Sequence, residues 1–269
     1  MDITHFNPTT DPGTSFTEYL RIAQPELLPN FMAHHVDSLD PEQHVHATTV
    51  VAMRFADGVI MAGDRRATIG HTIAYRKMDK VIPADSHSGI AISGSADLAM
   101  NIVKLFQVEL EHYEKMAGMQ LSFEGKANLL SQFVRGNFSM LAQGFAVIPL
   151  FAGYDLAHKT GRVLTYGGLG GRYEEYEFVA TGSGSVQARN WIKASYKSDL
   201  SEVDAIDIAI RSLFAAADED AATGGPDLVR KIFPTIAVIT DEGYRAMDDV
   251  LVEARAISLL AGPEQGGDQ

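Results

Sequence analysis

The first regular pattern of hydrophobic positions in this chain predicts a β-hairpin. From Thr49 to Phe55 the residues are mostly β-branched or apolar, and Val59 to Ala62 is a second apolar run. Ala56-Asp57-Gly58 lies between them and supplies a turn, so the two runs predict two antiparallel strands. Asp64 then falls at the end of the second strand.

Other apolar runs predict further short strands. Thr72 to Tyr75 and Lys80 to Ile82 are expected to form a second hairpin. The glycine-rich segment Gly167 to Gly171 lacks the spacing and the following helix of a dinucleotide loop, and it is interpreted as a turn. The remaining strands are expected at Ser88 to Gly94, Val147 to Tyr154, Arg162 to Tyr166, Glu175 to Thr181, Thr235 to Thr240 and Tyr244 to Met247.

Apolar positions at helical spacing predict helices between these groups of strands. The first follows Ser95, a good N-cap residue, and ends at Gly118. Its apolar stripe comprises Leu98, Ile102, Leu105, Phe106 and Tyr113. Ser201 and Asp204 are placed as a capping pair for a later helix. The other helices are expected near Ala127 to Leu141, Ser185 to Lys197, Glu202 to Asp218 and Val250 to Leu260.

The order of these elements indicates the fold class. Strands are grouped with strands, instead of alternating singly with helices, which favours antiparallel sheets covered by helix layers. We therefore expect an α+β fold in which two stacked antiparallel sheets lie between two helix layers. One domain is expected from residue 48 to residue 261, followed by a mobile tail from 262 to 269.

Residues 1–47 differ in composition from the rest of the chain. Their sequence is typical of a linker with too little apolar surface to fold alone. One segment, Ser15 to Ile22, has the pattern of a short helix. The leader is interpreted as a flexible tail or, more sharply, as a removable propeptide. It holds half of the ten prolines of the chain, namely Pro8, Pro12, Pro25, Pro29 and Pro41.

Composition excludes several classes of function. The chain has no cysteine, which rules out disulfides, thiolate metal sites and cysteine nucleophiles. The net charge is -13, and such a surface repels phosphate backbones and anionic lipid, so neither nucleic acid nor a membrane is expected as a partner. No apolar run approaches the roughly 18 residues of a membrane helix. The leader lacks the pattern of a secretory signal, and a cytoplasmic protein is the simplest interpretation.

Four residues have types and positions that suggest chemistry. Thr48 opens a strand after a leader that looks dispensable, and Asp64 follows at the end of the adjacent strand. Lys80 precedes another apolar stretch. Gly94 ends a strand and begins a helix, where a backbone N–H can bind developing negative charge. Each signal alone is weak, because an Asp–Lys pair is more often a surface ion pair and a strand-end glycine is usually a turn.

The chain also resembles a known family. The segment TTVVAMRFADGVIMAGDRRAT from residue 48, with Lys80 and ISGSAD in step, is similar to the β-subunit of a bacterial 20S proteasome. The resemblance continues through PLFAGYD, ATGSGS and DEDAATGGPDLVRKIFPT and covers essentially all of residues 48–250. The leader segment SFTEYLRIAQPELLP resembles the propeptide of the actinobacterial type.

This resemblance implies a threonine endopeptidase of the N-terminal nucleophile hydrolase class, with an αββα sandwich fold. Thr48 corresponds to the nucleophile, Asp64 and Lys80 to its acidic and basic partners, and Gly94 to the oxyanion-binding amide. The residues near the free amine are matched by Ser183 and Asp220, and the hydroxyl of Thr223 matches a serine or threonine of related subunits.

The chemistry accounts for these residue types. A threonine hydroxyl is a poor nucleophile unless a base accepts its proton, and a free α-amine with a pKa of about 7.7–8.0 is suited to that task. Lys80, held cationic by Asp64, would stabilise the alkoxide and help keep the amine neutral. No metal or other cofactor is required.

Activation requires cleavage between Ala47 and Thr48, because an internal threonine has no free amine. Thr48 would attack the preceding carbonyl itself. The family usually has glycine before the threonine, whereas Ala47 adds a Cβ and restricts the backbone. We expect processing to occur, but more slowly.

The resemblance also implies a substrate site and partners. Ala67, Met78, Ile92, Ala96 and Met100 would surround the pocket for the residue before the scissile bond; all are apolar, which predicts cleavage after hydrophobic residues. Thr68 and Ala96 would pair with the substrate backbone as with an added strand.

The family forms heptameric rings, two stacked β-rings between two α-subunit rings, with ATPase rings that feed polypeptides to the inner chamber. Two alternatives remain: the simpler bacterial threonine peptidase ring that works with its own unfoldase, and a non-catalytic scaffold β-subunit.

Overall fold

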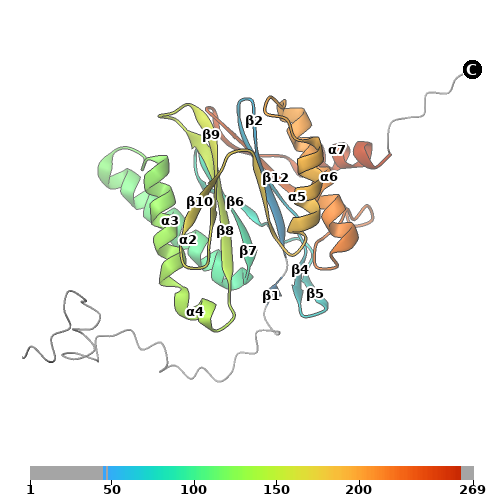
Figure 1. Ribbon diagram of the computed structural model, residues 1–269, viewed down its shortest axis with the longest axis horizontal. Helices are drawn as coiled ribbons and strands as arrows, with labels where there is room; N and C mark the ends of the chain where they lie inside the picture. The colour runs from blue at the N-terminus through green and yellow to red at the C-terminus, as the bar shows by residue number, and fades with distance from the viewer. Residues whose placement is uncertain (1–44, 47, 262–269) are drawn as a thin grey trace, which may run out of the picture. The chain divides into compact units, whose positions relative to one another are not determined.

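A computed structural model describes residues 45–46 and 48–261 of the chain. Two antiparallel sheets are stacked face to face, and helices cover the outer face of each (Figure 1). The expected α+β fold with four layers is thus confirmed.

The first sheet carries the start of the domain at its centre. Its strand order is β11-β2-β3-β12-β13, and every neighbouring pair is antiparallel. The predicted hairpin is present, and Val50 pairs with Gly63. The strands are β2 (Thr49–Phe55), β3 (Gly58–Gly63), β11 (Phe178–Gly182), β12 (Thr235–Thr240) and β13 (Gly243–Ala246).

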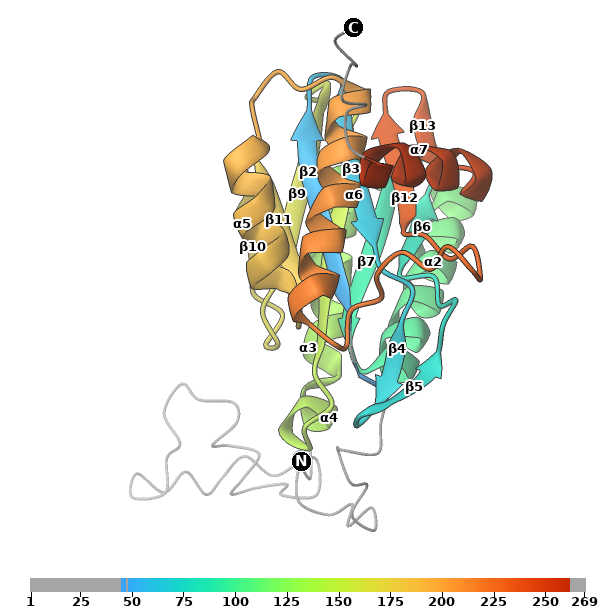
Figure 2. The same ribbon diagram turned by 90° about the vertical axis from the view of Figure 1, so that its right-hand side faces the viewer.

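The second sheet has the order β10-β9-β8-β7-β6 and is also antiparallel throughout. A smaller third sheet, β1-β4-β5, extends from one end of the molecule (Figure 2). The second sheet comprises β6 (Val81–Asp85), β7 (Ser88–Gly94), β8 (Val147–Asp155), β9 (Thr160–Tyr166) and β10 (Arg172–Glu175). The third comprises β1 (Val45–His46), β4 (Ala67–Ile69) and β5 (Thr72–Tyr75).

The helices divide between the two outer faces. Figure 2 shows α5, α6 and α7 over the first sheet, and α2 and α3 lie on the opposite side of the sandwich against the second. Their bounds are α2 (Ala96–Ala117), α3 (Phe123–Gly136), α4 (Phe138–Ala142), α5 (Ser185–Ser195), α6 (Glu202–Glu219) and α7 (Asp249–Ala261).

Three apolar clusters hold these layers together, one under each helix layer and one between the sheets. The middle cluster consists mainly of small and medium side chains, which allows the sheets to approach closely. Burial of this kind contributes roughly 25 cal/mol per Å² of apolar surface. The fully buried residues of the middle cluster include Val50, Ala52, Val59, Met61, Ala91, Leu150, Ala152 and Val163.

The structure corrects the predicted pairing of the second hairpin. Thr72 to Tyr75 is a strand, but it pairs with β4, and the strand after Lys80 pairs with β7. Strand partners depend on contacts outside the local run, so the apolar pattern alone does not select them. The polar edge strand β10 was also not predicted, because Arg172–Glu175 has no apolar alternation.

The predicted second helix is in fact two. It breaks at Asn137, whose N–H bonds to the carbonyl oxygens of Val134 and Arg135 and ends α3. Phe138 therefore belongs to α4 and is exposed.

Two features of the predicted first helix also differ. Leu105 and Tyr113 face solvent on α2, while Val103 and Leu110 take their places in the core. Ser95 is the N-cap residue, but its side chain makes no capping bond. Gly118 ends the helix in the left-handed conformation as predicted, and Ser201 accepts a hydrogen bond from the Asp204 N–H at the start of α6.

In the described part of the chain, no helix combines the length and the apolar character needed to cross a lipid bilayer.

Candidate active site

Thr48 lies directly before β2 and is buried, with 6% of its surface exposed. Its carbonyl oxygen accepts a hydrogen bond from the Ser183 N–H at 2.9 Å. Gly182 has a φ of +100°, and a Cβ there would lie 1.7 Å from the Thr48 carbonyl oxygen. Only glycine fits at this point, which explains one glycine of the TGSGS segment.

Asp64 follows β3 and is fully buried. One carboxylate oxygen, Oδ1, accepts from Lys80 Nζ at 2.7 Å and from the Thr49 N–H at 2.8 Å. The other, Oδ2, accepts from the N–H groups of Arg66 and Gly224, each at 2.8 Å. A carboxylate has about four lone-pair positions, so these bonds occupy them. Asp64 is therefore suited to holding a cation and the backbone, and not to removing a proton from a substrate.

Lys80 is the largest of the fully buried side chains and ends within this cluster. Its Nζ donates to Asp64 and also to the carbonyl oxygen of Arg66, at 2.5 Å. Burial lowers the pKa of Lys80 below its ordinary value, and the nearby Arg66 lowers it further, although Asp64 opposes the shift. A cation placed in this low-dielectric setting interacts strongly with new negative charge.

Asp220 forms a second acidic group, at the end of α6. Its Oδ2 accepts from Ser183 Oγ at 2.5 Å and from Thr223 Oγ1 at 2.6 Å. Partial burial raises the pKa of Asp220, but the hydrogen bonds from Ser183, Thr223 and the Ala222 N–H, with the charge of Lys80, outweigh it and hold the pKa below its ordinary value. Asp220 is thus an anion in the neutral pH range.

Gly94 ends β7 beside the start of α2. Its φ is +98°, and a Cβ would lie 2.1 Å from the carbonyl oxygen of Ala146. The position therefore requires glycine, and the residue is partly exposed. This geometry is compatible with the amide role that the resemblance implies.

The predicted pocket residues fall into two groups. Met78 and Ala96 line an open cavity of about 600 Å³. Ile92 and Met100 do not line it and belong to the apolar cluster under α2, against which Met78 also packs. Ala67 and Thr68 are buried in β4. The cavity is more polar than the sequence predicted: its lining also includes Ala74, Tyr75, Arg76, Lys77 and Asp97.

The end of the leader is paired with this region. In β1, Val45 pairs with Ile69 and His46 pairs with Thr68, in the antiparallel sense. The chain thus already adds a strand to β4, the strand that was predicted to bind substrate backbone. Ala47 and the predicted leader helix, Ser15 to Ile22, lie outside the described residues.

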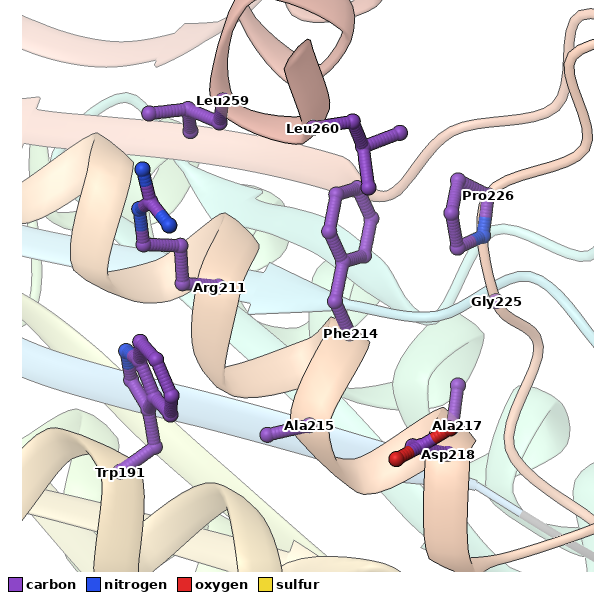
Figure 3. Close-up of a pocket in the computed structure, with 10 residues that line it drawn as sticks. All are labelled: Trp191, Arg211, Phe214, Ala215, Ala217, Asp218, Gly225, Pro226, Leu259 and Leu260. Carbon is purple, nitrogen blue, oxygen red and sulfur yellow. The ribbon is translucent and has the colours of Figure 1, made fainter. Parts of the chain in front are cut away.

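A second cavity, of about 540 Å³, lies on the outer helix layer (Figure 3). Trp191 of α5, Phe214 of α6 and Leu260 of α7 point toward it, with Arg211 at one side. It contains none of the predicted site residues. Its lining is mainly apolar, with the charged side chains of Arg211 and Asp218.

Several contact residues of the site were not identified from the sequence, three of them close to the ion pair or to Thr223. The Thr49 hydroxyl, the Arg66 main chain and the Gly224 N–H all bond to members of the acidic groups or to their partners. The repeated threonine at the strand start was visible, but nothing local indicated what it contacts. Over the described residues, no group of three or more His, Asp and Glu side chains is arranged to hold a metal ion.

Comparisons with known proteins find related sequences over most of the chain. Residues 44–231 match the family model described as proteasome subunit. A proteasome subunit beta of Streptomyces griseus is 51% identical, with 93% of this chain and 89% of that protein covered. Proteins of the same name from Acidothermus cellulolyticus and Acidimicrobium ferrooxidans are 49% and 46% identical; the matches cover 94% of this chain in both cases, and 89% and 92% of the relatives.

Proposed function

The chain belongs to the proteasome subunit family, and we propose that it is a catalytic β-subunit of a 20S proteasome, with Thr48 as the nucleophile of a threonine endopeptidase. The observation that carries the proposal is the buried Asp64–Lys80 pair, which is bonded to the strand directly after Thr48. A buried ion pair is costly to maintain for stability alone. Its position beside a threonine supports a catalytic role.

Cleavage between Ala47 and Thr48 creates the missing base. The new α-amine of Thr48 has a pKa close to neutral, and the Lys80 cation disfavours a second positive charge nearby. Ser183 donates its only hydroxyl proton to Asp220, so its oxygen is left to accept a hydrogen bond from the amine. These groups hold the amine where it can take the proton of Thr48 Oγ1.

Peptide cleavage then proceeds in two steps. Thr48 Oγ1 attacks the scissile carbonyl carbon while its proton passes to the α-amine, and the Gly94 N–H binds the oxyanion. Collapse breaks the C–N bond, and the amine returns the proton to the leaving peptide. Water then attacks the ester, gives a proton to the α-amine and releases the acid, which restores the Thr48 hydroxyl.

The same hydroxyl releases the leader. Thr48 Oγ1 attacks the carbonyl of Ala47, the peptide bond becomes an ester with a free amine, and water hydrolyses it. The pairing of Val45 and His46 with β4 supports this step, because it aligns the leader as a substrate strand. We therefore propose residues 1–47 as a propeptide, and expect Ala47 to slow its removal.

The cavity beside β5 and α2 is proposed as the site for the residue before the scissile bond. Met78 and Ala96 favour a hydrophobic side chain there. Fluorogenic peptides ending in Leu or Tyr, Arg, and Asp test this: the Leu and Tyr peptides should have the highest kcat/KM. Fastest cleavage after Asp would instead mean that Arg76 and Lys77 dominate the site.

Assembly completes the proposal. We infer heptameric β-rings stacked between α-subunit rings, with a ring-shaped ATPase that delivers unfolded polypeptides, in the cytoplasm. Enclosure of this kind restricts a broad peptidase to chains that are threaded into it. The apolar residues on the outer helix faces, such as Leu105 and Val108, are available for such contacts.

Substitution of the nucleophile tests the function. Assembled Thr48→Ala should retain its leader and lose peptide hydrolysis, whereas Thr48→Ser should keep both processing and measurable cleavage. Equal cleavage by Thr48→Ala and the wild type would identify the chain as a scaffold and assign the activity to another subunit.

A further inference from the structure

Thr49 is hydrogen-bonded to Asp64 directly and to Asp220 through Thr223. Resting on the proposed function, we propose that the Thr49 hydroxyl is a positioning group: it joins the start of α5 to Asp220 through Thr223, and so fixes the backbone on which the nucleophile Thr48 is carried. The position of Thr49 in the sequence, directly after Thr48, does not by itself predict this role.

The hydroxyl of Thr49 is completely buried and has two partners. Thr49 Oγ1 accepts a hydrogen bond from the Gly184 N–H at 2.9 Å and lies 2.6 Å from Thr223 Oγ1. Gly184 is the N-cap residue of α5. The hydroxyl therefore links β2 to the N-cap residue of a helix, 135 positions later in the chain.

The direction of the hydrogen bonds follows from the number of protons. Thr223 has one hydroxyl proton, and it donates that proton to Asp220 Oδ2. Thr223 Oγ1 can then only accept from Thr49, so the Thr49 hydroxyl is the donor. The chain of donation runs from Gly184 through Thr49 and Thr223 to the Asp220 carboxylate. Each bond in such a chain polarises the next, and the anion at its end orders all of them.

The main chain of Thr49 is held by the other carboxylate residue. Its N–H donates to Asp64 Oδ1 at 2.8 Å, and its carbonyl oxygen accepts from the Asp64 N–H at 3.1 Å. The preceding carbonyl, of Thr48, is bound by the Ser183 N–H. The side-chain hydroxyl adds an anchor on the α5 side to those on the Asp64 side.

This arrangement matters because Thr49 is the residue to which the attacking residue is joined. Removal of the leader turns Thr48 into a chain end whose covalent link to the rest of the protein is Thr49. An error of about 1 Å in the position of a reacting group can cost about a hundredfold in rate. Loss of the Thr49 anchor should therefore slow the chemical step and leave peptide binding on β4 and in the cavity largely unchanged.

Thr49→Val tests the proposal, since valine has nearly the shape of threonine and no hydroxyl. In the assembled particle we expect kcat to fall by about ten- to a hundredfold with KM within about twofold of the wild type, and release of the leader, followed by intact mass, to slow as well. Thr49→Ser restores the hydroxyl and should recover kcat to within about threefold.

A matched control is Ser212→Ala, which removes an equally buried hydroxyl whose bond, among the residues that the structure describes, is to the Ala209 carbonyl inside α6. It should leave kcat and KM unchanged. Should Thr49→Val fail to assemble, Thr49→Ser and Thr49→Ala decide the same question without a β-branched side chain. A slow Thr49→Ser, or a Thr49→Val with wild-type kcat and processing, overturns the positioning role. An inactive wild-type particle would instead overturn the proposed function itself.

Discussion

A fully buried cation, Lys80, and a partly buried one, Arg162, are held in different ways on the two halves of the sandwich. Lys80 pairs with Asp64, and burial lowers its pKa. Arg162 of β9 pairs with three carboxylates, of Glu124, Asp155 and Glu174. The hydrogen bonds that Arg162 donates to Glu174, followed by those to Glu124 and Asp155, outweigh burial and raise the pKa of Arg162 above its ordinary value.

The difference separates a group suited to chemistry from one suited to structure. The arginine is committed to its carboxylates and packs over the Phe123 ring, with 4.7 Å between Cζ and the ring centroid, which ties α3 to the second sheet. The lysine has a desolvated charge that gains most when a new anion forms beside it. Burial and the carboxylates around each cation together distinguish the two roles: burial lowers the pKa of Lys80, and three carboxylates outweigh it at Arg162.

The largest expected effect is the loss of catalysis in Lys80→Met. Removing the buried cation removes the electrostatic stabilisation of the Thr48 alkoxide and should lower kcat by at least about a hundredfold. Peptide hydrolysis by the assembled particle measures it. Because this variant leaves Asp64 buried and unpaired, Asp64→Asn/Lys80→Met serves as a second form in which both charges are absent. A folded double variant with wild-type kcat would contradict the electrostatic role.

Arg162→Met should lower the stability of the protein and leave catalysis nearly unchanged, in contrast to Lys80→Met. Chemical denaturation is expected to show a loss of about 2–3 kcal/mol, less than the roughly 3–5 kcal/mol of a fully buried pair, since Glu124 and Glu174 are partly exposed. kcat should stay within about twofold of the wild type. A large loss of kcat with unchanged stability would break the comparison.

The stability lost in Arg162→Met should also depend on pH. Hydrogen bonds from Arg162 and Arg172 lower the pKa of Glu124 from 4.5, and the bonds to Asp155, from His158 and Arg162 among others, outweigh burial and lower its pKa from 3.8. Groups with a lowered folded-state pKa stabilise the protein above their ordinary pKa and lose that contribution as pH falls through the folded value. The difference between variant and wild type should therefore be full at pH 7 and shrink below about pH 4.

Lys126→Met provides a matched control for Lys80→Met. Lys126 also forms a buried pair with an aspartate, with 2.5 Å between Nζ and Asp85 Oδ2, but it lies under the second sheet, away from Thr48. In Lys126→Met, Asp85 keeps the hydrogen bonds from the His87 N–H and Ser88 Oγ. The expected loss of folding stability is therefore smaller than for Arg162→Met, about 1–2 kcal/mol. kcat should not change. Loss of hydrolysis in both lysine variants would mean that any buried ion pair is needed, and not the one beside Thr48.

The smallest effect is expected at the exposed pair of Lys115 and Glu111 on α2. Both side chains are more than half exposed, so water and salt screen their interaction. Lys115→Ala should leave the thermal melting midpoint unchanged within error at physiological salt. If Lys115→Ala lowered the melting midpoint as much as Lys126→Met does, the exposure of an ion pair would not determine its contribution to stability.

The sequence predicted the elements of the fold better than their partners. Apolar runs located β2, β7 and β12, because a buried strand consists of consecutive apolar residues that are visible in the sequence. The predicted pairing of Thr72–Tyr75 with Lys80–Ile82 was wrong, because strand partners are decided by contacts outside the local run, and β5 pairs with β4. The exposed face of α2 was misplaced at Leu105 and Tyr113, where apolar side chains remain in contact with solvent.

For the site, the resemblance supplied residue positions, and the structure supplied their contacts. The bond between Thr49 and Thr223 joins residues 174 positions apart, and no local pattern indicates it. The four donors that occupy Asp64 likewise come from separate segments. Such contacts decide whether a carboxylate removes a proton or instead binds a cation and the main chain. They are properties of the folded chain.

N-terminal sequencing of the assembled, active particle tests the central claim most directly. The account predicts a chain that begins Thr-Thr-Val-Val-Ala, with Thr48 first and residues 1–47 absent, and a Thr48→Ala particle that still begins at Met1. An active particle whose chain begins at Met1, at Thr49 or at any other residue would contradict the assignment of Thr48 as the nucleophile and its amine as the base.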